Sequence, residues 1–242
     1  MSILGNKYKL GLGMGGALIK VCLPHRGGRP VVLSFPTPKE MVSKGVLQQI
    51  DMVGEAFKPW IRKHQLNNYP VVATLPASTL VLRHIQIPKL KAKETAEAVE
   101  WEARRVLPFA LEEAQMDWIQ QGAEVSEEGE LKNILLVAVR DTIVERYIEA
   151  TKEAGLKLVA LDIAPLALGR WLLKGSQGAS LIIDIGAETT QVHFFEGTKL
   201  VFSRSFTVGG VQATGAIAAA GDLSIEDAEV KKLRGEYRED WL

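Results

Sequence analysis

The N-terminal part of the chain alternates short apolar runs with glycines and prolines, which is typical of strands joined by turns. Apolar residues then recur at helical spacing over residues 46–61, which predicts one long helix with a kink at Pro59. The continuous apolar run of residues 71–75 ends at Pro76 and suits a strand that is buried on both faces. The strands predicted before the helix cover residues 8–12, 17–23 and 31–35.

A second unit with a different pattern begins near Val81. An acidic loop over residues 124–130 joins its two middle strands, and Asp141 is expected to cap its last helix. Leu82 and Ile85 fall on opposite faces of its first strand. This order of elements is typical of a compact α+β module inserted into the first unit. The pattern predicts a strand, a charged helix, two strands and a helix over residues 82–87, 91–107, 114–121, 133–140 and 142–154.

The remaining residues return to the strand pattern of the N-terminal part. Ser224, with Asp227 three residues later, resembles a capping box at the start of the last helix. The predicted elements are a strand at 158–162, a helix at 165–174, strands at 180–185, 191–195 and 200–206, and helices at 211–220 and 225–234. We therefore predict a first lobe over residues 1–80 and 156–178, an inserted subdomain over 81–155, and a partial second lobe over 179–242.

Composition and charge exclude several classes of function. The 242 residues include 29 Lys+Arg and 29 Asp+Glu, so the net charge is zero, and no basic run suggests a nucleic-acid binder. The single cysteine, Cys22, excludes an intrachain disulfide framework and favours a reducing compartment. Residues 10–23 loosely resemble a signal peptide, but glycines and Lys20 interrupt them. No apolar run suits a spanning helix, so we expect a cytoplasmic protein without direct membrane insertion.

The segment GLGMGG matches the dinucleotide-binding pattern G-x-G-x-x-G at Gly11, Gly13 and Gly16. That interpretation is disfavoured, because a strand-like segment follows where a long helix is required, and because no acid occurs before Glu40. A hairpin whose glycine turn approaches another group closely explains the pattern better.

A second glycine turn suggests a duplicated, two-lobed fold. When Gly15 is aligned with Gly186, strand, turn and strand coincide in both segments. In such a fold both turns face one cleft, where their N–H groups can bind phosphate. The hydroxyls of Thr189 and Thr190 would add donors, and Asp184 could hold a hydrated Mg²⁺ through a water. Two ordinary hairpin turns, with Asp184 in a structural role, explain the same pattern, and both interpretations stay open.

Several stretches of the chain resemble one known group of proteins. They are LGLGMGGALIKV, VVATLPASTLVLRHIQIPKL, EAVEWEARRVLPFALEEAQMDW, ILLVAVRDTIVERYIEATKEAGLKLVALDIAPLALGR and LIIDIGAETTQVHFFEGTKLVFSRSFTVGG. The arrangement resembles the actin-like ATPase superfold, which includes FtsA, and within it the PilM family of type IV pilus assembly. The resemblance implies an α/β fold of ribonuclease-H-like βββαβ lobes with an inserted α+β subdomain. It also implies a site for ATP with Mg²⁺ that uses Gly15, Gly16, Asp184, Gly186, Thr189, Thr190, Gly209 and Gly210.

Two departures from the family pattern weaken the nucleotide site that the resemblance implies. Gly13 stands where actin-like proteins usually carry an acid of the metal and water-activating machinery, so we expect no hydrolysis. The chain also ends soon after the second hairpin, where the family continues with a further subdomain and an adenosine-contacting motif. We expect a truncated or divergent member, or a partial chain, in which any binding of ATP with Mg²⁺ is weak.

The resemblance leads to two functional hypotheses. The first is a non-catalytic scaffold of pilus assembly, or of a related secretion system, at the cytoplasmic side of the inner membrane. It would bind the short N-terminal cytoplasmic tail of a single-span inner-membrane partner of the PilN type. The second is a weak ATP-binding or ATP-hydrolysing enzyme of the same fold. The sequence leaves the oligomeric state open.

The tail is expected in a groove between residues 71–90 and residues 91–114. Trp101 lies off the apolar stripe of its helix, so it either anchors a partner or packs under a neighbouring loop. The expected partner contacts are Trp101, Leu82, Ile85 and Pro88.

Overall fold

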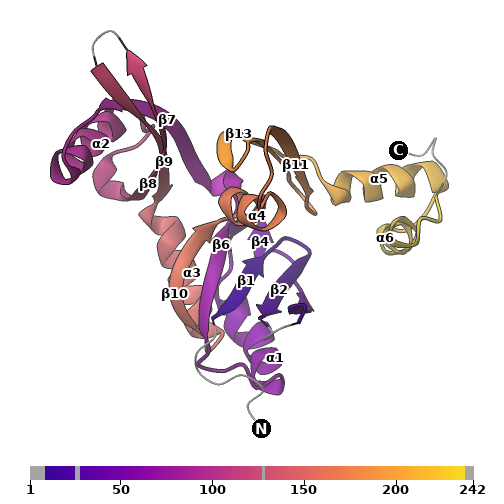
Figure 1. The fold of residues 1–242 in the computed structure, drawn as a ribbon. Helices are drawn as coiled ribbons and strands as arrows, with labels where there is room; N and C mark the ends of the chain where they lie inside the picture. The colour runs from indigo at the N-terminus through magenta and orange to yellow at the C-terminus, as the bar shows by residue number, and fades with distance from the viewer. Residues whose placement is uncertain (1–8, 25–27, 127–128, 238–242) are drawn as a thin grey trace.

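The computed structural model describes residues 9–24, 28–126 and 129–237 (Figure 1). Tyr8, the predicted start of the first strand, and residues 127–128 of the predicted acidic loop lie outside the described residues. Three larger sheets, one two-stranded sheet and the helices that pack on them make up the described fold, and two C-terminal helices extend away from the rest (Figure 1). No helix among the described residues is both long and apolar enough to cross a bilayer.

The largest sheet belongs to the first lobe and has five strands in the order β10-β6-β1-β2-β3. The first three strands in sequence form an antiparallel meander, β6 pairs in parallel with β1, and β10 pairs in parallel with β6. This arrangement leaves β10 at one edge of the sheet. Their bounds are β1 (Leu10–Met14), β2 (Leu18–Leu23), β3 (Val31–Pro36), β6 (Pro70–Leu75) and β10 (Lys157–Ile163).

One face of this sheet forms the main core. Alternate residues of β1 and β6, among them Leu12 and Ala73, are buried there against a helical layer. That layer consists of the π-helix η1 (Val53–Phe57), α1 (Lys58–Lys63) and α3 (Asp141–Glu153). Tyr147 of α3 is the largest fully buried side chain in it, so α3 packs into the first lobe although its sequence falls in the range predicted for the inserted subdomain.

The prediction of one helix over residues 46–61 is wrong at its start. Val46 and Leu47 form the short strand β5 (Val46–Leu47), which pairs with β4 (Val42–Ser43). Lys44 and Gly45 make the tight turn with φ values of 50° and 79°, a conformation that no helix contains. Helical structure begins only at Asp51, directly before η1, in which the Lys58 N–H donates to the Val53 carbonyl, and Pro59 lies in the first turn of α1.

The second sheet has three strands in the order β7-β9-β8 and carries α2 (Ala92–Val106) on one face. Its strands are β7 (Leu80–Pro88), β8 (Ala114–Ser126) and β9 (Gly129–Arg140). The acidic loop predicted over 124–130 is wrong, because β8 and β9 continue through its described residues. Their charge is accommodated by pairing across the sheet: Glu130 accepts from Lys89 at 2.7 Å and Glu124 from Asn133 at 2.7 Å.

Asp141 does not cap α3 as predicted. The helix begins at Asp141 itself, and Arg140 occupies the capping position. The Asp141 carboxylate instead accepts a hydrogen bond of 2.7 Å from the Gln115 amide of β8. A negative charge in the first turn interacts favourably with the helix dipole, so Asp141 stabilises the start of α3 without being its cap.

The third sheet is an antiparallel meander of β11 (Ala179–Ile185), β12 (Thr190–Glu196) and β13 (Lys199–Phe206). Its inner face packs on α4 (Ala164–Leu172), where the absence of a side chain at Gly169 lets the Phe195 ring approach the helix. A Cβ atom at Gly169 would lie 2.6 Å from that ring. The outer face exposes Leu181, Ile183 and Ile185 of β11.

The last two helices, α5 (Gly210–Gly221) and α6 (Ile225–Arg234), pack mainly on each other. They extend to the right of the third sheet in Figure 1. The predicted cap of the final helix is confirmed, because the Ser224 hydroxyl accepts from the Asp227 N–H at 3.0 Å.

Candidate functional site

The two predicted glycine turns have the same local geometry. The Gly15 N–H donates to the Leu18 carbonyl at 3.1 Å, and the Gly186 N–H donates to the Thr189 carbonyl at 2.9 Å. A Cβ atom on either glycine would lie 2.9 Å from that carbonyl oxygen. Both turns therefore require glycine for the same steric reason, which is physical support for an internal duplication.

The structure brings the two turns together. A Cβ atom built on Gly16 would lie 3.8 Å from Ala187 Cβ and 3.7 Å from a carboxylate oxygen of Glu188. That carboxylate accepts a hydrogen bond from the Lys44 N–H of the β4–β5 turn. Glu188 thus lies between the lobes and links the second turn to the first lobe.

The start of α5 is held against the second turn by its own backbone. The Gly209 N–H donates to the Gln212 side chain at 2.8 Å, and the Gly210 N–H donates to the Gly186 carbonyl at 2.9 Å. A Cβ atom on Gly209 would lie 2.6 Å from the carbonyl oxygens of Gly186 and Ala187. These two N–H groups are consumed inside the protein, so they do not present a phosphate-binding helix terminus.

The side chains predicted to bind phosphate or Mg²⁺ are Thr189, Thr190 and Asp184, and they differ in burial and in hydrogen bonding. The Thr190 hydroxyl donates to the Val208 carbonyl at 2.7 Å, which is a structural contact, and Thr189 is half-buried. Asp184 is half-buried and is the acid that acts electrostatically on His193. No group of three or more His, Cys, Asp or Glu side chains that could hold a metal occurs among the described residues. Asp184 therefore offers one carboxylate, which suits only a hydrated Mg²⁺ held through water.

His193 lies on the same face of β12 as Gln191 and is fully buried. Its Nδ1 is 2.9 Å from the Ser203 hydroxyl, whereas its Nε2 has no hydrogen-bond partner among the described groups. Burial lowers the pKa of His193, and the Asp184 charge partly offsets that effect. The imidazole is therefore held neutral near pH 7.

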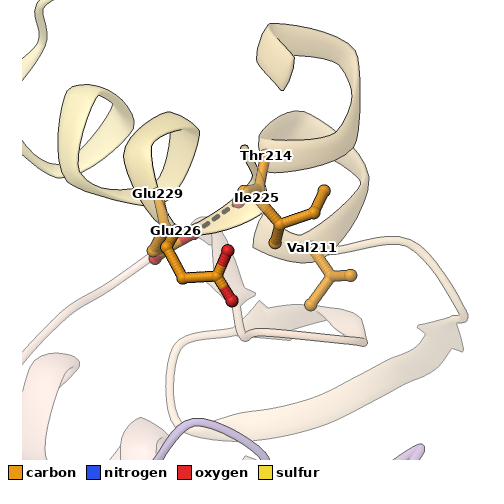
Figure 2. A pocket seen from close by; sticks show the side chains of 5 residues that line it. All are labelled: Val211, Thr214, Ile225, Glu226 and Glu229. Carbon is orange, nitrogen blue, oxygen red and sulfur yellow. Dashed lines mark hydrogen bonds between the residues drawn. The ribbon is translucent and has the colours of Figure 1, made fainter. Parts of the chain in front are cut away.

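A pocket of about 420 Å³ lies between α5 and α6 (Figure 2). The N–H of its lining residue Val211 donates to the Ala187 carbonyl of the second turn at 2.8 Å. Lys232 donates to the Gly210 carbonyl at 3.0 Å, to Thr214 at 2.8 Å and to Glu229 at 2.5 Å. Burial alone would raise the pKa of Glu229, but hydrogen bonds from Lys232 and Thr214 outweigh it and lower that pKa. The pocket is lined by Val211, Thr214, Ile225, Glu226 and Glu229.

These residues fit a nucleoside better than they fit a phosphate chain. The apolar side chains of Val211 and Ile225 suit a flat ring, and the carboxylates of Glu226 and Glu229 suit hydroxyl or amino donors. This pocket was not predicted from the sequence, where Glu229 and Lys232 show only the i, i+3 spacing that is common on helix surfaces.

The predicted partner contacts do not form one surface. Trp101 is 61% exposed with the Arg105 guanidinium 4.9 Å from its ring, so it does not pack under a loop. Ile85 is only 8% exposed and packs in the core beneath α2, so its prediction as a partner contact is wrong. Leu82 faces the opposite side of β7, against α4, and Pro88 is exposed at the strand end.

A different groove, of about 480 Å³, runs between α3 and β10 at the edge of the five-stranded sheet. Ile148 of α3 is 51% exposed and Val159 of β10 is 42% exposed. The pairing of β10 with β6 shifts register between Leu158 and Ala160, so Val159 lies at a bulge. The groove is lined by Val144, Ile148, Thr151, Lys152, Leu156, Lys157, Leu158, Val159, Ala160 and Leu161.

The predicted tail groove does not coincide with this groove. The expected walls, residues 71–90 and 91–114, contribute no side chain to the α3–β10 groove. The order of strands in a sheet is not encoded in local periodicity, so the exposed edge of β10 could not be located from the sequence.

Comparison with known proteins gives the family. The model of a family described as type IV pilus assembly protein PilM matches residues 29–242. A solved PilM-PilN type IV pilus biogenesis complex contains a chain that is 31% identical, with a TM-score of 0.79. That match covers 96% of this chain and 71% of the other.

More distant structures share only the fold. EutJ, the ethanolamine utilization protein of Carboxydothermus hydrogenoformans, is 18% identical with a TM-score of 0.58, covering 96% of this chain and 63% of its own. MreB5 of Spiroplasma citri, solved with ADP, is 14% identical with a TM-score of 0.50, covering 94% of this chain and 62% of its own. They confirm the predicted actin-like α/β fold. The chain belongs to the PilM family of type IV pilus assembly proteins.

Proposed function

We propose that this protein is a non-catalytic cytoplasmic scaffold of type IV pilus assembly. It binds the extended cytoplasmic tail of a single-span inner-membrane partner of the PilN type, which keeps it at the inner membrane. Family membership supports the assembly role, and the 31% identical relative was solved as part of a PilM-PilN complex. The observation that carries the proposal is the exposed apolar groove along the edge strand β10.

The groove suits an extended peptide for two physical reasons. An edge strand presents unpaired backbone groups, to which a peptide can add as a further strand. The partly exposed side chains of Ile148 and Val159 offer apolar contacts for alternate residues of that strand. Burying such side chains stabilises a complex by up to about 1.5 kcal/mol each, because both are already half-buried.

The test is fluorescence anisotropy with a labelled N-terminal tail peptide of a PilN-type protein. Ile148→Asp places a charge in the groove, and we expect it to weaken binding by about tenfold or more. Val125→Asp is the matched control, since Val125 is 88% exposed at the β8–β9 hairpin, far from the groove in sequence. Binding that survives Ile148→Asp but is lost in Trp101→Ala would move the site to α2 and contradict the proposed groove.

A second candidate function, nucleotide binding without hydrolysis, is favoured by the α5–α6 pocket beside the second glycine turn. We propose that Glu226 and Glu229 would contact the nucleoside and that Gly13, which provides no acid, leaves hydrolysis without a water-activating group. Calorimetric titration with Mg-ATP should give weak binding that Glu226→Gln reduces further. Phosphate release above background that is lost in Asp184→Ala would establish an ATPase instead.

A further inference from the structure

The two ends of the α3–β10 groove differ in charge. Lys152 in the last turn of α3 and Lys157 at the start of β10 both line the groove and are both exposed. They flank the turn that reverses the chain, whereas Val144 and Leu161 lie at the other end. The groove is therefore apolar along its length and positive at its turn end.

The positions of the two lysines are fixed by the backbone. The Leu156 N–H donates to the Thr151 carbonyl at 2.9 Å, and the Gly155 N–H to the Lys152 carbonyl at 2.9 Å. The Lys157 N–H donates to the Tyr69 carbonyl at 3.0 Å, which ties the start of β10 to the sheet. Both lysine side chains thus extend from a backbone that is already ordered by hydrogen bonds. Binding therefore costs little backbone conformational entropy at this turn.

Neither lysine is neutralised by the protein. No ion pair of the described residues includes Lys152 or Lys157. The acids nearest in sequence are Glu149 and Glu153 of α3. Glu153 lies against η1, with a carboxylate oxygen 3.1 Å from the Cβ position of Gly54, and Glu149 does not line the groove. Two cations beside an apolar surface are a natural binding site for one carboxylate.

We infer that the lysine end of the groove binds an acidic side chain of the partner's tail, so that the groove selects extended segments with an Asp or Glu beside alternating apolar residues. This inference rests on the proposed function of the same groove. The apolar contacts provide affinity, and the carboxylate fixes the register and direction of the bound strand. Binding is then salt-sensitive, because both lysines are exposed to solvent.

The test is selection from a library of ten-residue peptides in which apolar and randomised positions alternate. The wild-type protein should enrich Asp or Glu at one end of the binders, and Lys152→Gln/Lys157→Gln should not. The matched control, Lys93→Gln, changes an exposed lysine of α2 and should enrich acids as the wild type does. A selected peptide should bind the wild type roughly five- to tenfold more tightly than its Glu→Gln version.

The outcomes separate the two proposals. Apolar binders without an acid preference, lost in Ile148→Asp, would overturn the carboxylate inference and leave the groove as a tail site. Acid preference that disappears when the peptide is amidated would assign the lysines to a chain-terminal carboxylate and contradict an internal acidic side chain. Selection that is the same for the wild type and Ile148→Asp would overturn both.

Discussion

Gly209 holds the start of α5 against the second glycine turn, and its role is steric. A Cβ atom there would meet two backbone carbonyl oxygens at 2.6 Å, so neither neighbour is a flexible side chain that could move away. We expect Gly209→Ala to destabilise the protein by about 2 kcal/mol or more. Urea denaturation measures this, and Gly215→Ala is the matched control.

Gly215 lies in the interior of α5 with open space around its Cβ position. Alanine there should stabilise the helix by roughly 0.5 to 1 kcal/mol, since only the backbone entropy changes. Equal effects of the two substitutions would show that Gly209 does not pack as described.

His193 gives the fold a pH dependence whose sign follows from its burial. Its pKa is lowered in the folded state by burial, so the unfolded state binds a proton first as the pH falls. Stability should therefore decrease as the pH falls below the ordinary histidine range, by at most about 1.4 kcal/mol for each unit of pKa difference. Urea midpoints at several pH values should show this slope in the wild type. A slope that persists unchanged in His193→Gln would assign it to another group.

The α5–α6 pair depends on a small apolar cluster, so the cap at Ser224 matters more than in a larger core. Removing its hydroxyl in Ser224→Ala should destabilise α6 locally by about 1 kcal/mol. Hydrogen exchange should become faster over Ile225–Arg234 and stay unchanged in β1 and β6. Ser224→Asp, which keeps an acceptor, should restore protection; failure to do so would mean that the cap does not stabilise the helix.

Elements with a strong local signal could be predicted from the sequence, and those decided by turns or pairing could not. The final helix has the predicted bounds because its cap and its periodicity agree. Residues 46–61 show helical spacing, yet the φ values at Lys44 and Gly45 turn the chain into a hairpin before the helix begins. The acidic residues 124–130 resemble a loop, but cross-strand partners such as Asn133 and Lys89 keep their described part in the sheet.

In the candidate site, too, some features could be predicted from the sequence and others could not. The two glycine turns were predictable because a repeated steric requirement leaves glycine at equivalent positions, Gly15 and Gly186. The α3–β10 groove was not, because it depends on β10 lying at the edge of the sheet. Ile85 was misassigned because an apolar residue in a strand does not reveal which face a later helix will cover.

At the scale of the whole molecule, the two lobes meet through backbone and side chains at the turns. The Ala77 N–H donates to Gln191 of β12 at 2.9 Å, and the Lys44 N–H donates to Glu188. The Cβ positions of Gly16 and Ala187 are 3.8 Å apart, which matches the usual separation in a disulfide.

Gly16→Cys/Ala187→Cys in a Cys22→Ser background should therefore form a disulfide under mild oxidation. Intact-mass spectrometry detects the loss of two hydrogens, and a reductant reverses it. Pairing Gly16→Cys with Ala179→Cys, at the far end of β11, is the control and should stay reduced. Equal oxidation of both pairs would mean that the turns do not face each other as described.

The central claim is that a PilN-type tail adds to β10 in the groove beside α3, and hydrogen exchange of the complex tests it most directly. Tail peptide should slow exchange over Lys157–Ile163 and in the facing part of α3, and leave α2 unchanged. Protection around Trp101 in α2, with β10 exchanging as in the free protein, would contradict the proposed site.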